Sequence, residues 1–154
     1  VFPESNNAEC HQELAGQGGA LIGFGFPPIC SVGYYKTVDQ TYRLQFAQQS
    51  GSLRRTVNVT LAAALSGRCR IVGVVDVQSS STTLTLYLDG EQIGTSTYSG
   101  IPDGTAASIA RCFSVAGVKE YGGWINYTGK VYSCLLFDRA LSAAEIAALT
   151  PKQA

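Results

Sequence analysis

The segment from Thr83 to Gly94 is the feature of this sequence that most constrains its fold. Apolar and polar residues alternate along Thr83–Leu88, Asp89-Gly90 follows directly, and Glu91–Gly94 continues the segment. Alternation of this kind indicates a half-buried strand, and Asp-Gly supplies the positive φ angles of a tight two-residue turn. The segment therefore predicts an antiparallel β-hairpin.

Further short segments have the same β character and are separated by turn residues. Tyr42, Leu44 and Phe46 alternate with polar or small residues, as in a strand with one buried face. Cys69–Val77 is mostly apolar, which is typical of a centre strand covered on both faces. Other strands are expected within residues 53–59, 108–118 and 130–137. Together with 17 glycines and no methionine, these segments favour an all-β sandwich or barrel.

The two ends of the chain differ in character. Residues 1–30 are rich in Gly, Pro, Asn and Gln, and we expect residues 1–40 to be irregular, with one or two irregular strands near Ala20–Phe26. Near the other end, Ser142 and Glu145 have the spacing of a capping box ahead of an apolar stretch, which predicts a short C-terminal helix. The length fits a single domain over residues 1–154.

The charge balance argues against two classes of partner. Charged residues make up 14% of the chain, the formal net charge is zero, and there is no run of Lys or Arg. Nucleic acid is therefore not an expected partner. No apolar run approaches the roughly 20 residues that span a bilayer, so membrane insertion is not expected either.

Two features favour the secretory pathway. The sequence opens on Val1 without a leader, and we expect a signal peptide to have been removed. The sequons at Asn58 and Asn126 would accept glycans in a eukaryotic secretory pathway. We therefore expect a secreted protein that is extracellular or lies at the cell surface.

The five cysteines predict disulfide bonds and not a metal site. They contain no Cys-x-x-Cys pair, and His11 is the only histidine, so the usual zinc spacings are absent. Cys10 and Cys30 enclose the irregular N-terminal segment, and a disulfide between them would stabilise the fold by roughly 3 kcal/mol. One further pair is expected among Cys69, Cys112 and Cys134.

Two stretches, in this order, resemble laminin-G-like members of the concanavalin A-like lectin and glucanase superfamily. Arg70–Asp76 followed by Leu84–Gly90 is similar to the family's paired central strands and their hairpin. Gly129–Val131 leading to Leu136–Leu149 is similar to the closing strand and terminal helix. The resemblance implies an all-β jelly roll, which is a two-sheet antiparallel sandwich, here with a short C-terminal helix. The first 40 residues depart from the family's usual opening, since they carry cysteines and prolines.

The residues that glycoside hydrolysis would need are missing from the matching stretches. The glucanase branch of the superfamily carries its nucleophile and acid on one strand as Glu-x-Asp-x-x-Glu, and no such run is present. Asp76 and Glu91 stand singly, and Asp89 belongs to the turn. We therefore expect a protein that is not an enzyme.

A calcium ion is the one cofactor that the resemblance implies, because many relatives hold one at a sheet rim through oxygen ligands. Asp103, in Ile101-Pro102-Asp103-Gly104, and Asp39 are the candidate ligands. The Pro-Asp-Gly sequence is equally an ordinary turn that needs no ion.

An aromatic loop at residues 121–129 is the candidate ligand site. Tyr121, Trp124 and Tyr127 offer faces that stack on sugar rings, and Asn126 can both donate to and accept from hydroxyls. The structural alternative is that Tyr127 fills the core and Trp124 covers a sheet edge.

Three hypotheses for function follow. The first is a non-catalytic carbohydrate-binding or adhesion module whose partner is a glycan or an extracellular protein. The second is a structural subunit of an extracellular assembly, such as a surface appendage, filament or virion part, that associates with copies of itself. The third is a glycoside-active enzyme whose carboxylates would meet from different strands.

Overall fold

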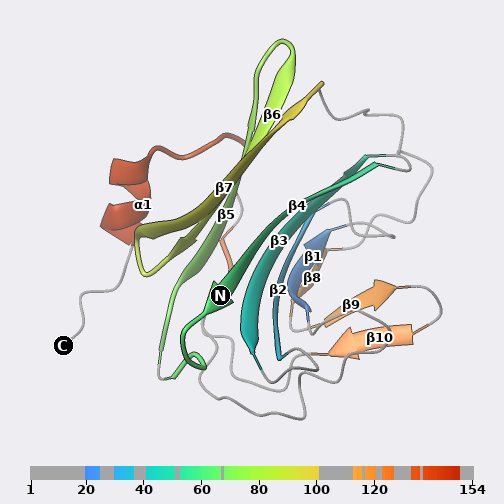
Figure 1. Cartoon of the computed structure of the whole chain (residues 1–154), viewed down its shortest axis with the longest axis vertical. Coiled ribbons are helices and arrows are strands. Elements are labelled where there is room, and N and C mark those ends of the chain that lie inside the picture. Colours follow the sequence, from blue (N-terminus) through green and yellow to red (C-terminus); the bar gives the residue numbers. More distant parts are fainter. Residues whose placement is uncertain are drawn as a thin grey trace.

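A computed structural model describes residues 20–24, 30–36, 41–50, 53–66, 68–100, 113–115, 117–120, 123–126, 133–135 and 137–149. These residues form strands and one short helix (Figure 1). The strands are β1 (Ala20–Phe24), β2 (Cys30–Lys36), β3 (Tyr42–Ser50), β4 (Leu53–Leu61), β5 (Ile71–Val77), β6 (Ser81–Leu88), β7 (Glu91–Ser99), β8 (Phe113–Val115), β9 (Gly117–Glu120) and β10 (Gly123–Asn126). The helix is α1 (Ala143–Leu149).

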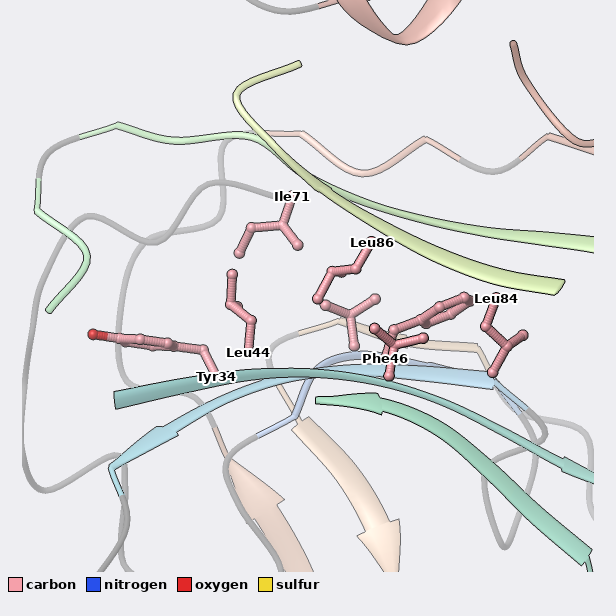
Figure 2. Close-up of a cluster of buried hydrophobic side chains, with 8 residues drawn as sticks. Tyr34, Leu44, Phe46, Ile71, Leu84 and Leu86 are labelled. Carbon is pink, nitrogen blue, oxygen red and sulfur yellow. The ribbon is translucent and has the colours of Figure 1, made fainter. Parts of the chain in front are cut away.

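The strands form a sandwich of two main antiparallel sheets. One sheet has five strands in the order β4-β3-β2-β1-β8, and the other has three in the order β5-β6-β7. β9 and β10 form a separate two-stranded sheet. Figures 1 and 2 show that the five-stranded sheet is curved, with its convex face toward β5-β6-β7 and its concave face toward the β9–β10 hairpin. The predicted antiparallel sandwich with a short C-terminal helix is confirmed.

The core lies between the convex face and the three-stranded sheet, where alternate residues of each strand meet (Figure 2). Leu44 of β3 and Leu84 and Leu86 of β6 are completely buried. Burial of a leucine side chain stabilises the fold by about 1.5–3 kcal/mol, so these positions hold the two sheets together. The remaining members of the buried cluster are Val32, Tyr34, Phe46, Val57 and Ile71.

The β6–β7 hairpin forms as the sequence predicts. Asp89 and Gly90 both have positive φ angles, 51° and 89°, as a primed two-residue turn requires. The Asp89 carboxylate also accepts a hydrogen bond from the Arg70 backbone N–H at 2.7 Å. The turn is thereby tied to the start of β5.

The predicted capping box begins α1. The backbone N–H of Ser142 donates to a Glu145 carboxylate oxygen at 2.8 Å, and the Glu145 N–H donates to the Ser142 hydroxyl at 3.3 Å. Ile146 of the helix is completely buried and packs with Val74 and Tyr87 on the outer face of the three-stranded sheet. α1 therefore covers one end of that face.

Three strand expectations differ from the structure. Among the described strands β5 lies at the edge of its sheet and not at its centre. Its apolar residues on both faces are explained by the core on one face and α1 on the other. Within the range 130–137, residues 133–135 and 137 are not in a strand. The single strand expected over 108–118 is divided between β8 and β9, which belong to different sheets. Apolar runs alone do not reveal which sheet a strand joins.

The first 40 residues, expected to be irregular, contribute β1 and β2 to the larger sheet. β2 pairs with β3 without interruption from Cys30 to Lys36. The β1–β2 pairing shifts register between Ala20 and Ile22, so β1 is irregular at that point.

Candidate functional site

The concave face of the five-stranded sheet is polar along β3 and β4. Alternation directs Leu44, Phe46 and Val57 to the core and their neighbours to the opposite, concave face. The described side chains at the concave positions of these strands are half-buried or exposed except for that of Ala47, which is buried. Their polar members are Arg43, Gln45, Arg54, Thr56, Asn58 and Thr60.

Side-chain hydrogen bonds connect four of these residues. Gln45 donates through Nε2 to Asn58 Oδ1 at 2.7 Å, and Arg54 donates through Nη2 to Gln45 Oε1 at 3.0 Å. Asn58 in turn donates through Nδ2 to Thr56 Oγ1 at 3.1 Å. Because Gln45 and Asn58 lie directly opposite each other in the β3–β4 register, the sheet itself sets this arrangement. The network, defined here as Gln45, Arg54, Thr56 and Asn58, presents ordered donors and acceptors at the surface.

Arg43 lies two residues before Gln45 on the same face. Its side chain is half-buried, and its Nε is buried without a hydrogen-bond partner. An unsatisfied buried donor costs about 1–3 kcal/mol. A hydrogen-bond acceptor beside the Nε of Arg43 would therefore stabilise this side chain.

The charge of this face is entirely positive along β3 and β4. The two strands contain three arginines and no acidic residue. Arg55, the third arginine, is buried, and its guanidinium donates to Gln48 Oε1 at 3.2 Å and to the Ser99 carbonyl at 3.4 Å. Arg43 and Arg54 are the two that lie on the concave side.

The outer face of the three-stranded sheet carries a second polar surface. The hydroxyls of Thr83 and Thr97 are 2.9 Å apart, and those of Thr85 and Thr95 are 3.2 Å apart. These exposed threonine pairs satisfy one another across β6 and β7, and this surface includes neither of the concave arginines.

A cleft of about 600 Å³ runs along β5. It lies between that strand, the Cys30 end of β2 and the chain that leads to α1, and its wall is mainly apolar. Val77, Leu135 and Phe137 line it and are exposed large hydrophobic residues, at 49%, 56% and 44% of their full surface. None of the residues predicted for sugar or calcium binding lines the described part of this cleft.

The aromatic loop expected at 121–129 contains a strand, since residues 123–126 form β10 and pair with β9. Trp124 and Asn126 lie on β10, and the hairpin sits on the concave side of the larger sheet, next to β1 (Figure 2). The structure describes the backbone of these two residues only, and Tyr121 and Tyr127 lie outside the described residues. The prediction that these four residues bind sugar stays a prediction.

The other predicted site residues are placed only in part. Asn58 is exposed on the concave face and belongs to the polar network. Asp39 and Asp103 lie outside the described residues, and within the described part no group of three or more His, Cys, Asp or Glu side chains could hold a metal ion. Calcium at Asp39 or Asp103 stays a prediction.

Three cysteines are described, Cys30, Cys69 and Cys134, and none of them forms a disulfide with another described cysteine. Cys10 lies outside the described residues, so its disulfide with Cys30 stays a prediction. Cys69 and Cys134 are not bonded to each other, and Cys112 is not described. Burial raises the pKa of Cys30 to about 11, which makes it a poor nucleophile at neutral pH.

Arg139 has a structural partner. Its guanidinium makes a bidentate pair with Glu145, with distances of 2.6 and 3.0 Å, and not with Asp138. Hydrogen bonds from Arg139 and then from Ser142 lower the pKa of Glu145 to about 2.

The described residues contain no helix long and apolar enough to cross a membrane.

The sequence analysis did not predict the polar network. The sequence signal for it is the occurrence of amide, hydroxyl and guanidinium side chains at alternate positions of two successive strands. Those residues become neighbours only when β3 and β4 pair in the observed register.

The comparisons with known proteins bear on the whole chain. Residues 6–147 match the sequence profile described as the concanavalin A-like lectin/glucanases superfamily. No curated protein and no solved structure matches the chain. Because the profile covers most of the sequence, and the antiparallel sandwich agrees with it, the chain belongs to the concanavalin A-like lectin/glucanases superfamily.

Proposed function

We propose that this chain is a non-catalytic carbohydrate-binding module that holds its ligand on the concave face of the five-stranded sheet. The observation that carries the proposal is the surface network of Gln45, Arg54, Thr56 and Asn58. Membership of the superfamily supports a module of the carbohydrate-binding or adhesion type.

The chemistry of the network suits sugar hydroxyls. A hydroxyl both donates and accepts, and the amides of Gln45 and Asn58 offer both functions from fixed positions. Hydrogen bonds already formed within the network hold these groups in place, so less side-chain freedom is lost when a ligand binds. The β9–β10 hairpin, which carries Trp124, lies on the concave side of the same sheet, next to β1, and we propose Trp124 as an aromatic residue that stacks on the sugar.

Binding without turnover is supported by where the carboxylates lie. Hydrolysis of a glycoside uses two carboxyl groups about 5–9.5 Å apart around the bond. β3 and β4 carry no acidic residue, while Asp76 is on β5 of the other sheet and Asp89 is in the β6–β7 turn. We propose a secreted protein whose partner is a glycan or a glycan-bearing extracellular protein.

A glycan array tests the proposal with the full chain and a Gln45→Ala/Asn58→Ala variant. We expect the chain to bind a defined set of glycans and the variant to lose at least tenfold in affinity, because neutral hydrogen bonds of about 0.5–1.5 kcal/mol each are removed. Thr83→Ala/Thr97→Ala is the matched control, since it removes two polar side chains from the opposite surface. Equal loss in both variants, or release of reducing sugar from a bound glycan, would contradict the proposal.

A structural subunit that associates with copies of itself is the second candidate. The exposed Val77, Leu135 and Phe137 in the β5 cleft favour it, because contiguous apolar surface commonly marks a protein interface. Light scattering of the purified chain separates the candidates: a monomer that binds glycan supports the first, and concentration-dependent oligomers reduced by Phe137→Ser support the second.

A further inference from the structure

Two arginines of the concave face lie close to Gln45. Arg54 reaches Gln45 directly, since its Nη2 is 3.0 Å from Gln45 Oε1. Arg43 is the preceding residue of β3 on the same face, and residues two apart along a strand are about 6.6 Å apart. The register places Arg43 opposite Thr60 and Gln45 opposite Asn58, so the two arginines border one patch of neutral polar groups.

The two strands that carry this pair of positive charges provide no carboxylate of their own. β3 and β4 have no acidic residue, and among the described residues neither Arg43 nor Arg54 forms an ion pair. The Arg43 Nε also lacks an acceptor. Since the formal net charge of the whole chain is zero, this positive patch is a local feature of one surface and not a property of the composition.

We propose that the ligand of the concave face is an acidic glycan, and that a sugar carboxylate lies between Arg43 and Arg54. This inference rests on the function proposed above and names its ligand class. A planar guanidinium matches a carboxylate through two parallel N–H donors, which a neutral sugar cannot exploit. Gln45 and Asn58 then bind hydroxyls of the same or the adjacent sugar.

The arrangement explains why the arginines occur together with amides. A carboxylate relieves the repulsion between two like charges and supplies acceptors to the guanidinium groups. The amides add donors and acceptors that distinguish a polysaccharide from a simple polyanion. Because Arg54 is exposed and Arg43 is only half-buried, attraction to the ligand must weaken as salt shortens the Debye length.

The test uses the full chain and titration calorimetry with three probes at low and high salt. Oligomers of polygalacturonate carry a carboxylate on each sugar, their methyl esters have the same sugars without the charge, and dextran sulfate supplies negative charge without carboxylates. We expect polygalacturonate to bind at least tenfold more tightly than either of the other probes, and more weakly at high salt.

Variants then locate the site. Arg54→Gln and Arg43→Gln should each weaken polygalacturonate binding about tenfold, which is the usual effect of losing a charged hydrogen bond. Arg54 is exposed, so its variant tests the proposal even if Arg43→Gln fails to fold. Arg68→Gln is the matched control, because it removes the same charge from an exposed residue in the connection between β4 and β5.

The outcomes separate the ligand class from the function. Equal binding of the acid and its methyl ester, lost in Gln45→Ala/Asn58→Ala, would overturn the acidic ligand and retain the carbohydrate-binding function. Equal or stronger binding of dextran sulfate, or equal loss in Arg68→Gln, would reduce the interaction to general charge attraction and overturn the proposal. No binding of these probes or of any glycan on an array would overturn both.

Discussion

The hydroxyl of Tyr98 in β7 bonds both backbone groups of Thr56 in β4. It accepts from the Thr56 N–H at 3.0 Å and donates to the Thr56 carbonyl. β4 is the outermost described strand of the five-stranded sheet, so no other described strand pairs with the outer side of its backbone. One side chain from the opposite sheet thereby protects an open edge and links the two layers.

Replacement of Tyr98 by Phe should therefore destabilise the sandwich by about 1–3 kcal/mol, because a buried or half-buried backbone donor and acceptor lose their partner. Urea unfolding measures the change. Tyr87→Phe is the control: no hydrogen bond of its hydroxyl is found among the described residues, so we expect a change below about 0.5 kcal/mol. Equal effects of the two variants would contradict the role of Tyr98.

Gly73 allows a close contact between the layers. A Cβ added at this position would lie 2.7 Å from two ring atoms of Phe46, a distance that real contacts do not reach. Gly73→Ala should cost about 1–3 kcal/mol of stability through overpacking. Combined with Phe46→Leu, which makes room, the loss should be smaller than the sum of the single losses in a double-mutant cycle. Strict additivity would show that the two residues do not compete for space.

The cap of α1 should respond to acid. Hydrogen bonds from Arg139 and Ser142 lower the folded-state pKa of Glu145 to about 2, from its ordinary value of 4.5. A carboxyl whose pKa is lowered by folding stabilises the fold above the unfolded-state pKa, and this contribution is lost as the pH falls through the folded-state value.

We therefore expect the stability of the α1 region to decline between about pH 4.5 and 2. Helical circular dichroism and urea midpoints measured across that range check the expectation. Glu145→Gln should be less stable than the parent at pH 6 and should show a weaker pH dependence below pH 5. A variant with the unchanged acid profile would exclude Glu145 as its source.

Cys69 should resist alkylation in the folded protein. Burial, followed by the nearby Asp89 charge, raises the pKa of this thiol from 9.0 to about 12. Because the thiolate is the reactive form, modification at pH 8 should be about a thousandfold slower than in urea. Peptide mapping after iodoacetamide treatment follows Cys69 separately from the other cysteines. Modification at the unfolded rate in native buffer would contradict the burial of Cys69.

The local elements of this protein could be predicted because their causes lie within a few residues of one another. Asp89-Gly90 adopts the positive φ angles that its composition favours, and Ser142 and Glu145 close the capping box three residues apart. The alternation of Leu44 and Phe46 with polar neighbours likewise predicted which face of β3 is buried. Each follows from turn chemistry, capping or a period of two, none of which needs the rest of the chain.

The position of each strand in the fold could not be predicted in the same way. β5 is apolar on both faces because the core covers one face and α1 the other, yet among the described strands it lies at the edge of its sheet. An apolar run reports only the polarity of side chains. Side-chain polarity does not show whether the backbone of a strand is hydrogen-bonded to neighbours along both of its edges.

Sequence alone determined that apolar and polar residues alternate along the strands, that the chain turns at Asp89-Gly90 and that a capped helix follows Ser142. It also determined the match to a lectin-like superfamily. Only the tertiary structure decided that Gln45 meets Asn58, 13 residues away, and that Tyr98 meets Thr56, 42 residues away. The physical reason is that strand register and the stacking of the two sheets bring distant residues together, and both depend on the packing of the whole core.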